Sequence, residues 1–355
     1  MQAQISVSGE INPYVMTRTT NSSQINLPFR LLSLDMGYSF EQFDLKTNSA
    51  IEHRIKTNKS QYDLRELYFA FYPEWGEVKL GKQIHSWGAA DAINPTNNLN
   101  PYDYYYMFKV GAGTKVGVLS LSSTYYSDSF QIEIIVNPYF NKNRIPYDED
   151  DFPLAPDNEP AIRYSPNEEV EVGLKLQTSL TNSDISLYFF SGNDRSPSLY
   201  TGIISAESST DLRMDLGYRK TTMFGSDYVT FVGDFTVRAE GAIYNTKTPS
   251  IKDNGLENNY FELREDVLYS QYVLQLEYTT QNDLMLSGQF IGSSIIAEDI
   301  KWLKSGNEIS SSSMVIPEFS PGMGTPFAMF SDKALLISSS GVLMDDQIDI
   351  QGSVM

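Results

Sequence analysis

The feature that most constrains the fold of this chain is an alternation of polar and apolar residues in pairs of short segments joined by tight turns. The clearest pair lies in the stretch 62–103, where the segments 62–72 and 77–85 flank the turn Pro73-Glu74-Trp75-Gly76. Side chains alternate between the two faces of a strand. One face of the second segment carries Glu77, Lys79, Gln83 and His85, and the other carries Val78, Leu80 and Ile84. The stretch therefore predicts a β-hairpin with one polar and one apolar face.

The same pattern recurs along the chain. About fifteen alternating segments are predicted as strands: 5–12, 32–40, 44–54, 62–72, 77–85, 115–126, 130–137, 169–180, 185–190, 214–232, 235–244, 269–280, 284–291, 333–343 and 347–355. Tight turns join the members of each pair, whereas the alternate connections are long, polar and rich in Pro, Gly, Asn and Asp. This contrast is typical of an outer-membrane barrel. The sequence therefore predicts an all-β fold, a transmembrane antiparallel up-and-down β-barrel.

The composition suits such a barrel and excludes other classes of protein. Tyr and Phe, at 23 and 19 residues, fit strands and the aromatic girdles of a barrel. The absence of Cys excludes disulfide bonds and thiolate metal sites. A net charge of −19 argues against nucleic acid as a partner, because its phosphates would be repelled. No apolar run approaches roughly twenty residues, which excludes a transmembrane helix.

The two ends of the sequence lead to a separate expectation. Met1 is followed almost at once by a strand-like segment, so we expect it to replace a cleaved leader. A closed bacterial barrel has an even number of strands, whereas the predicted number is odd. The ending Gly352-Ser353-Val354-Met355 also lacks a terminal aromatic residue. We therefore expect residues 1–355 to form a single barrel domain of about 16 strands when complete, without its signal peptide and truncated at the C-terminus.

Short motifs in a fixed order resemble a known family. They are Leu64-Arg65-Glu66-Leu67-Tyr68, Trp75-Gly76-Glu77-Val78-Lys79-Leu80-Gly81-Lys82-Gln83, Trp87-Gly88-Ala89-Ala90-Asp91, Asn94-Pro95, Val136-Asn137-Pro138-Tyr139-Phe140, Asn143-Arg144-Ile145-Pro146, Leu187-Tyr188-Phe189-Phe190-Ser191-Gly192 and Thr222-Met223-Phe224-Gly225-Ser226-Asp227. With these motifs the chain resembles Gram-negative porin-like barrels of unassigned function, related in outline to alginate-export and phosphate-selective porins. Lys82 stands where that family usually has Arg, and Lys cannot make a bidentate contact. The resemblance implies a porin-like fold in the bacterial cell outer membrane.

Charged residues on the predicted inward faces are candidates for lining a pore. They are Lys46, Glu52, Arg54, Lys79, Glu133, Glu171, Lys175, Arg238, Glu240 and Glu277. In a water-filled lumen, opposed acidic and basic rows would set the ion preference, as charged rings do in other pores. The alternative is that these side chains pair across strands and fill a polar interior. We favour pairing, because wide barrels need polar filling whether or not they conduct.

The loop that follows the hairpin supplies a second group of candidates, His85, Trp87, Asp91 and Asn94. This loop could fold inward as a constriction or ligand gate, where Trp87 would offer a stacking face and Asp91 a carboxylate. The alternative, which we favour, is a structured loop whose Trp87 sits in the interfacial aromatic belt while Asp91 and Asn94 cap turns.

The sequence offers little support for metal binding or catalysis. Asp148, Glu149, Asp150 and Asp151 could bind Ca²⁺ or bridge lipopolysaccharide phosphates, but consecutive acids without Gly-punctuated spacing are usually solvated. His85 and Ser86 are adjacent, so in a strand they would point to opposite faces and could not form a base–nucleophile pair. The chain also lacks a Gly-rich phosphate loop and zinc-ligand spacing. We therefore expect no metal site, no cofactor and no enzyme activity.

These observations favour a passive porin-like channel for small solutes. One alternative is a conduit for hydrophobic solutes or lipids, which the inward Tyr188, Phe190 and Tyr244 would suit. Another is a scaffold or adhesin that acts through its extracellular loops. The expected partners are outer-membrane lipid, lipopolysaccharide and small solutes, and a homo-oligomer is possible.

Overall fold

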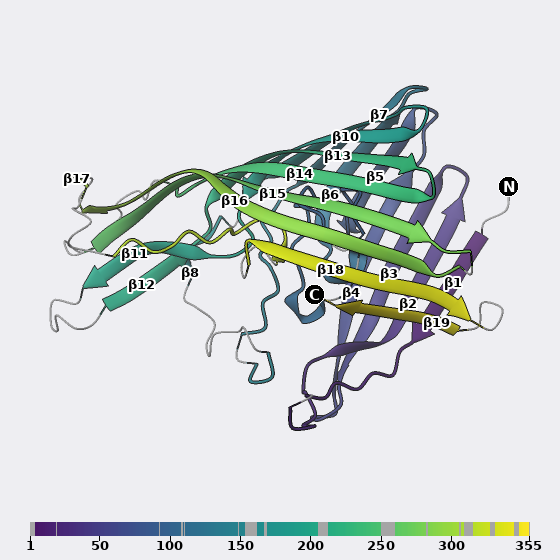
Figure 1. Ribbon diagram of the computed structural model, residues 1–355, viewed down its shortest axis with the longest axis horizontal. Helices are drawn as coiled ribbons and strands as arrows, with labels where there is room; N and C mark the ends of the chain where they lie inside the picture. The colour runs from purple at the N-terminus through teal and green to yellow at the C-terminus, as the bar shows by residue number, and fades with distance from the viewer. Residues whose placement is uncertain are drawn as a thin grey trace.

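The structure is a computed structural model, shown in Figure 1. It describes residues 4–18, 20–91, 93–107, 109, 111–147, 149–152, 162–166, 169–204, 212–249, 260–281, 283–304, 307–308, 315–326, 331–343 and 348–354. Long tilted strands lie side by side and curl around an interior that contains segments without regular structure (Figure 1). Among the described residues, no helix is long and apolar enough to cross a bilayer.

The described residues form one sheet of nineteen strands and two short 3₁₀ helices. The strands are β1 (Gln4–Ile11), β2 (Phe29–Phe40), β3 (Phe43–Arg54), β4 (Lys59–Phe71), β5 (Gly76–Gln83), β6 (Val118–Tyr126), β7 (Phe130–Asn137), β8 (Ile162–Tyr164), β9 (Glu171–Ser179), β10 (Ser183–Asn193), β11 (Ser198–Ile204), β12 (Leu212–Gly217), β13 (Lys220–Val232), β14 (Phe235–Lys247), β15 (Tyr260–Thr279), β16 (Met285–Lys304), β17 (Asn307–Glu308), β18 (Lys333–Leu343) and β19 (Ile348–Val354). The helices are η1 (Tyr104–Tyr106) and η2 (Gly111–Thr114).

Most of these strands form one antiparallel up-and-down meander. In the described part of the chain, the pairing order is β1-β2-β3-β4-β5-β6-β7-β9-β10-β13-β14-β15-β16-β18-β19. The remaining four strands, β8, β11, β12 and β17, extend the sheet at the long-loop end. No pairing joins β1 to β19 within the described residues, so the sheet is open there. The prediction of an all-β up-and-down fold is confirmed.

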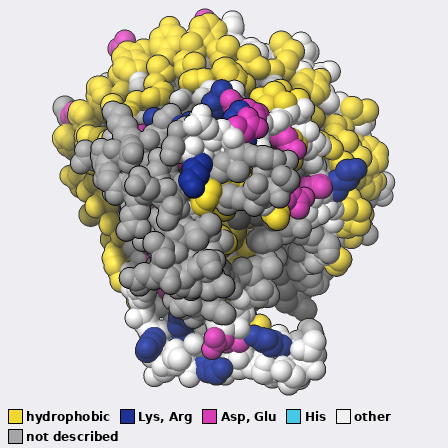
Figure 2. Space-filling view, turned by 90° about the vertical axis from the view of Figure 1, so that its left-hand side faces the viewer, with side chains coloured by type: hydrophobic (Ala, Val, Ile, Leu, Met, Phe, Trp, Pro, Cys, Tyr) yellow, Lys and Arg dark blue, Asp and Glu magenta, His cyan; other side chains and the backbone are white. Residues whose placement is uncertain are grey.

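The outer face of the meander is apolar, as the alternation predicts. Phe69 of β4 is 45% exposed and Leu80 of β5 is 58% exposed, and similar side chains project from nearly every strand of the meander. Figure 2 shows apolar side chains over the outer sides, while charged side chains gather on the long-loop end that faces the viewer. An apolar outer wall on a sheet whose backbone groups pair internally is what a bilayer requires. The fold is therefore that of a bacterial outer-membrane barrel.

The predicted contrast in loop length is present with one exception. Tight turns such as 41–42, 127–129 and 233–234 lie at one end of the meander, whereas 84–117 and 138–170 belong to the other end. The exception is the β3–β4 connection, residues 55–58, which is short although it lies at the long-loop end. The predicted turn Met344-Asp345-Asp346 lies outside the described residues, as does Asn282 in the turn before β16.

The prediction of one long or bulged strand at 214–232 is wrong, because this segment forms the two strands β12 and β13 with a break at Tyr218 and Arg219. The Arg219 side chain is 1% exposed and turns into the interior, where it contacts two carboxylates. Its carbonyl oxygen accepts a hydrogen bond from the backbone N–H of Asp194. The break coincides with a change of partner, because β12 pairs with β11 whereas β13 pairs with β10 and β14. β15 and β16 are also longer than predicted, at 20 residues each.

Candidate functional site

The β5–β6 connection, residues 84–117, folds into the barrel and is called the inward segment below. Its Trp87 is 2% exposed and packs on Tyr188 of β10, with ring centroids 5.1 Å apart. The indole Nε1 donates a hydrogen bond of 2.8 Å to Glu133 of β7. The expectation that Trp87 lies in the interfacial belt is therefore wrong: its N–H finds a carboxylate inside the barrel, as buried Trp requires.

A glycine on the wall makes room for this packing. A Cβ atom on Gly173 of β9 would come within 2.7 Å of both Trp87 and Leu99 of the inward segment. Atoms of a real side chain do not approach so closely, so a larger residue here would push the inward segment off the wall. Gly173 is thus a site of close approach rather than a weak point in the strand.

Glu240 of β14 anchors the same segment. Its Oε2 accepts hydrogen bonds from the backbone N–H groups of Ala89 and Ala90, at 3.0 and 3.3 Å, and from Asn94 Nδ2 at 3.2 Å. Its Oε1 accepts from the backbone N–H and the hydroxyl of Thr96, at 2.9 and 2.7 Å. The side chain is 4% exposed, and no cation among the described residues pairs with it. A buried carboxylate is stable here because five donors satisfy it.

Gly88 lies against the same carboxylate. Its φ of +88° belongs to a region that favours glycine, and a Cβ atom would come within 2.6 Å of both Glu240 oxygens. The backbone at Gly88 therefore needs glycine both for its conformation and for its closeness to the anchor.

Asp91 contacts the wall instead of capping a turn. Its backbone N–H donates to Gln275 Oε1 of β15 at 3.0 Å, and its carboxylate accepts from Gln275 Nε2 at 2.6 Å. Arg238 of β14 lies 3.7 Å from the same carboxylate, 3.0 Å from Glu277, and donates to the carbonyl of Ala89 at 2.9 Å. The expected capping role is therefore wrong for Asp91.

The other two candidates of the loop, Asn94 and His85, are also held in place. Asn94 makes a local bond to the carbonyl of Ala90, at 2.5 Å, besides its bond to Glu240. His85 is 7% exposed; its ring Nε2 lies 2.9 Å from Ser120 Oγ, and its backbone N–H donates to Asn100 Oδ1 at 2.7 Å. The structure therefore brings all four loop candidates into the barrel interior.

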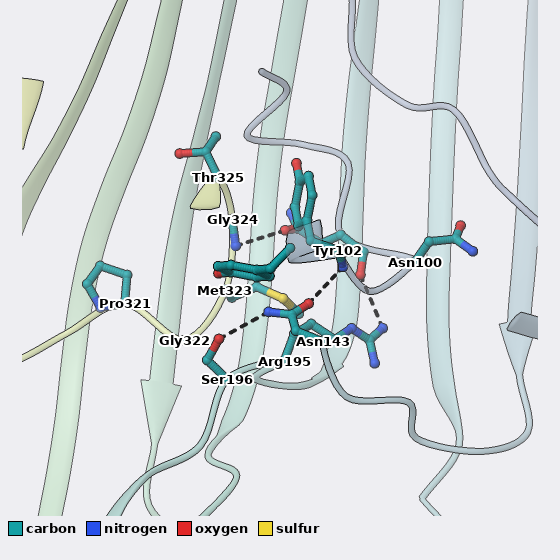
Figure 3. A pocket seen from close by; sticks show the side chains of 12 residues that line it. Asn100, Tyr102, Asn143, Arg195, Ser196, Pro321, Gly322, Met323, Gly324 and Thr325 are labelled. Atoms are coloured by element: carbon teal, nitrogen blue, oxygen red, sulfur yellow. Dashed lines mark hydrogen bonds between the residues drawn. The ribbon is translucent and has the colours of Figure 1, made fainter. Parts of the chain in front are cut away.

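A second insertion, residues 315–326 between β16 and β18, was not predicted. Its Phe319 packs on Tyr269 of β15 with ring centroids 5.4 Å apart, and Tyr269 stacks on Tyr244 at 4.6 Å. Figure 3 shows where this insertion meets the inward segment: the backbone N–H of Gly324 donates to Asn98 Oδ1 at 3.1 Å. The Pro- and Gly-rich run Pro321-Gly322-Met323-Gly324 was the signal for an irregular chain path, although it gave no indication of where the chain goes.

Two arginines with buried ion pairs hold the middle parts of these insertions. Arg195 binds Glu171 of β9 at 2.7 Å and donates to the carbonyls of Asn98 and Leu99 at 3.1 Å. Figure 3 shows Arg195 beside the junction of the two insertions. Arg219 binds Asp194 at 2.7 Å and Glu265 at 3.0 Å, and donates to the carbonyl of Ser320 at 2.7 Å. Each guanidinium thus ties one inserted segment to a carboxylate.

Most of the predicted pore-lining residues have a partner among the described residues. Ion pairs or hydrogen bonds join Lys46 to Asp44, Glu52 to Arg144, Arg54 to Glu149, Lys79 to Glu77, Glu133 to Trp87, Glu171 to Arg195 and Arg238 to Glu277. Among the described residues, Lys175 has no ion-pair partner, and its Nζ lies 5.8 Å from the ring centroid of Tyr188. These partners come from the connections between strands, from the same strand or, for Arg238, from the neighbouring strand, and not from directly opposed strand positions.

The acidic run in the β7–β9 connection also has partners. Glu149 pairs with Arg54, and Asp151 binds Arg18 at 2.8 Å and the backbone N–H of Asn26 at 2.8 Å. The hydrogen bond from the backbone N–H of Asn26, aided by the Arg18 contact, holds the pKa of the Asp151 carboxyl below its usual range. Asp148 lies outside the described residues. Within the described part of the chain, no group of His, Asp or Glu has the arrangement of a metal site.

A cavity of about 420 Å³ lies between the inward segment and the barrel wall. Its lining combines Trp87, Asp91 and Lys115 of the inward segment with inward residues of β9, β10, β13 and β14, among them Lys175, Asp184, Asp227 and Arg238. Both signs of charge therefore face this space. The arrangement can hold water and hydrophilic solutes.

Comparison with known proteins agrees with this fold. A family model described as "Protein of unknown function (DUF1302)" matches residues 35–306. No curated protein matches the sequence. The outer membrane channel DcaP of Acinetobacter baumannii has a similar structure, with a TM-score of 0.51 at 9% identity over 99% of this chain and 90% of that one.

Two further solved structures show weaker similarity. The trimer form of OmpT, an outer membrane protein of Vibrio cholerae, has a TM-score of 0.48 at 10% identity over 99% of this chain and 87% of that one. Salmonella typhi OmpF in complex with daunomycin has a TM-score of 0.44 at 9% identity over 98% of this chain and 88% of that one. At such identities, the likeness to DcaP concerns the fold alone.

Proposed function

This chain belongs to the family described as a protein of unknown function, DUF1302. We propose that it is an outer-membrane channel for passive diffusion of small hydrophilic solutes. The observation that carries the proposal is the charged cavity of about 420 Å³ between the inward segment and the wall. An apolar outer wall around a polar interior is the arrangement of a water-filled pore. The same outer wall supports outer-membrane lipid as a partner.

The inward segment would act as the constriction. It is held against β7, β9, β14 and β15 by Trp87, Glu240 and Asp91, so its position is set by the wall. Solutes would then pass between this segment and charged side chains such as Lys175 and Arg238, and the local field would select among them. No step of this mechanism consumes energy.

The apolar residues of the interior favour a hydrophilic solute over a hydrophobic one. Tyr188, Phe190 and Tyr244, which suggested a hydrophobic conduit, are 3%, 0% and 0% exposed. They pack with Trp87 and Leu99 in one buried cluster. A conduit needs apolar surface that a solute can reach, and these side chains offer almost none.

Single-channel recording on the full-length protein tests the proposal. Reconstitution in planar bilayers should give stable ohmic steps, and the reversal potential under a salt gradient should report the sign of the preferred ion. Gly173→Val should raise the conductance or its noise, because a Cβ atom there displaces Trp87 and Leu99. The control Gly288→Val on β16, where a Cβ atom meets nothing within 4 Å, should conduct like the wild type. A folded, inserted barrel that stays silent would refute the channel.

A further inference from the structure

The lumen contains charges of both signs, and the partner of each charge decides how much of it a solute meets. Besides the cavity of about 420 Å³ described above, a cavity of about 170 Å³ lies between β1, β2, β3 and β4. A third space, of about 150 Å³ beside β3, β4 and the inward segment, is balanced, because three acids and three bases line it. The ion preference of the lumen therefore depends on the first two cavities.

The cations of the larger cavity are mostly compensated or buried. Arg238 lies 3.0 Å from Glu277 and 3.7 Å from Asp91, so two carboxylates share its charge. Lys115 is 3% exposed, and burial lowers the pKa of its ammonium group far below the usual range. Lys175 is therefore the cation of this lining that keeps a charge without a carboxylate partner in the described part of the chain.

Two acids of the same lining have no cation of their own. Asp184 of β10 and Asp227 of β13 form no ion pair within the described residues, and the hydrogen bond that Asp227 accepts comes from the neutral hydroxyl of Tyr188. Asp184 pairs with Val229, which lies two positions from Asp227 on the same face of β13. Such diagonal neighbours are about 7–8 Å apart. Two adjacent carboxylates thus face the cavity against the single charge of Lys175.

A neutral acceptor of the same cavity also lacks a donor. Asn97 is 7% exposed and belongs to the lining, and its Oδ1 has no hydrogen-bond donor in the part of the chain that the structure describes. A buried acceptor without a donor is costly. An ammonium group donates three hydrogen bonds and accepts none, whereas a carboxylate only accepts. The lining therefore suits a solute that donates.

The smaller cavity has the same imbalance of charge. Its acids are Asp35 of β2, which accepts a hydrogen bond of 2.5 Å from Asn48 Nδ2, and Glu66 of β4. Neither acid forms an ion pair among the residues that the structure describes. Lys46 is the base of this lining, and it lies 3.5 Å from Asp44. Both cavities therefore contain carboxylates that no cation compensates.

We propose that the lumen prefers cations and that its solutes are small organic cations such as primary ammonium compounds, with Asp184 and Asp227 as the residues that set the preference. Uncompensated carboxylates on the wall of a narrow passage raise the local concentration of cations and lower that of anions. Lys175 opposes this effect with one charge. The proposal rests on the proposed function, because an ion preference requires an open pore.

The reversal potential of single channels under a KCl gradient tests the preference, on the full-length protein in planar bilayers. The wild type should be more permeable to K⁺ than to Cl⁻. Asp184→Asn and Asp227→Asn should each lower this permeability ratio at least about twofold, because a unit charge about 8 Å from the path of an ion changes its energy by about RT even in bulk water. A wild-type channel that prefers Cl⁻, or that does not discriminate, overturns the proposal.

Two further variants separate the effect of charge from structural damage. Lys175→Met removes the opposing cation and should raise the permeability ratio, a direction that damage to the lumen would not give. Asp266→Asn is the matched control, because it removes an exposed carboxylate that pairs with Lys247 outside both cavities, and it should keep the wild-type ratio. If Asp227→Asn does not fold, Asp184→Asn and Lys175→Met decide the question. An unchanged ratio in both of these variants overturns the role of the wall charges.

The class of solute is tested with a gradient of ethylammonium acetate, in which both ions are organic and similar in size. The reversal potential should again have the sign of a cation current. A current that acetate carries would overturn the solute class. A folded barrel that gives no current refutes the channel and this proposal with it, whereas an anion current refutes the preference and keeps the channel.

Discussion

Replacing Glu240 with Gln should release the inward segment from the wall. Glutamine turns one of the two carboxylate oxygens into an NH₂ group, which then faces donors instead of accepting from them. The orientation that loses least keeps the three bonds from Ala89, Ala90 and Asn94 and gives up the two from Thr96. Of these two, the Thr96 hydroxyl can rotate to accept from the new amide, but the Thr96 N–H cannot.

The magnitude follows from this count. A hydrogen bond to a charged group contributes about 1.5–3 kcal/mol, and a bond to a neutral acceptor contributes roughly half as much. Glu240→Gln loses the bond from the Thr96 N–H and weakens the three bonds from Ala89, Ala90 and Asn94, and these losses together exceed the value of one charged hydrogen bond. Removing a buried charge offsets part of that cost. We therefore expect the docking of the inward segment to weaken by about 2–4 kcal/mol, which is about 30- to 700-fold at 1.4 kcal/mol per tenfold.

Hydrogen exchange measured by mass spectrometry reads this change directly. Peptides covering residues 84–100 of Glu240→Gln should exchange faster by that factor, while peptides from β13 keep the wild-type rate. Glu133→Gln is the matched control, because it changes a wall carboxylate that accepts one bond, from Trp87, and the glutamine carbonyl still accepts it. Glu133→Gln should weaken the docking of the inward segment by about 1 kcal/mol, which corresponds to a roughly fivefold faster hydrogen exchange. Equal exchange of the inward segment in the two variants would refute Glu240 as the anchor.

Two other predictions concern buried charges, Arg219 between β12 and β13 and Asp103 within the inward segment. Arg219→Met leaves two buried carboxylates without their cation, so it should destabilise the barrel by about 3–5 kcal/mol and lower its thermal unfolding temperature. The control Lys220→Met breaks an exposed ion pair and should change stability by less than about 1 kcal/mol. Similar losses of stability in both variants would contradict this reasoning. Burial raises the pKa of Asp103 from 3.8 to about 6, against the lowering effect of Arg144, so the folded segment keeps a proton between pH 4 and 6 that the unfolded chain has lost. The free energy of unfolding should therefore fall by about 1.4 kcal/mol per pH unit as the pH rises through this window. In thermal unfolding at pH 4.5, 5.5 and 6.5, the unfolding temperature of Asp103→Asn should depend less on pH than that of the wild type. An unchanged pH dependence would contradict the role given to Asp103.

The wall of the barrel could be predicted from the sequence because a bilayer acts on every strand in the same way. Phe69 and Leu80 must face lipid whatever their neighbours are, so alternation within one segment is enough to assign their face. The break at Arg219 was missed because its cause is not local. The contacts that turn its side chain inward come from Asp194 and Glu265, 25 and 46 residues away in sequence.

The path of the inward segment could not be predicted for the same reason. Trp87 meets Glu133 at a separation of 46 residues, and Ala89 meets Glu240 at 151. A Trp beside polar residues fits an interfacial belt and a buried contact equally well, and alternation does not distinguish the two. Gly173 and Gly225, two glycines of the wall that lie against the inward segment, were local hints of close approach.

The same limit applies to the charges of the lumen, and it decides which of them a solute can use. Alternation assigns Glu240, Glu171 and Lys175 to the inward face alike, yet their partners differ. Glu240 is satisfied by five neutral donors and Glu171 by Arg195, so neither offers charge to a passing ion. Lys175 has no ion pair in the described part of the chain, and neither has Arg65, which does not belong to the predicted rows. The charges that face the lumen therefore depend on which inward side chains, of either sign, are left without a partner, and not on the total of inward charges that the sequence shows.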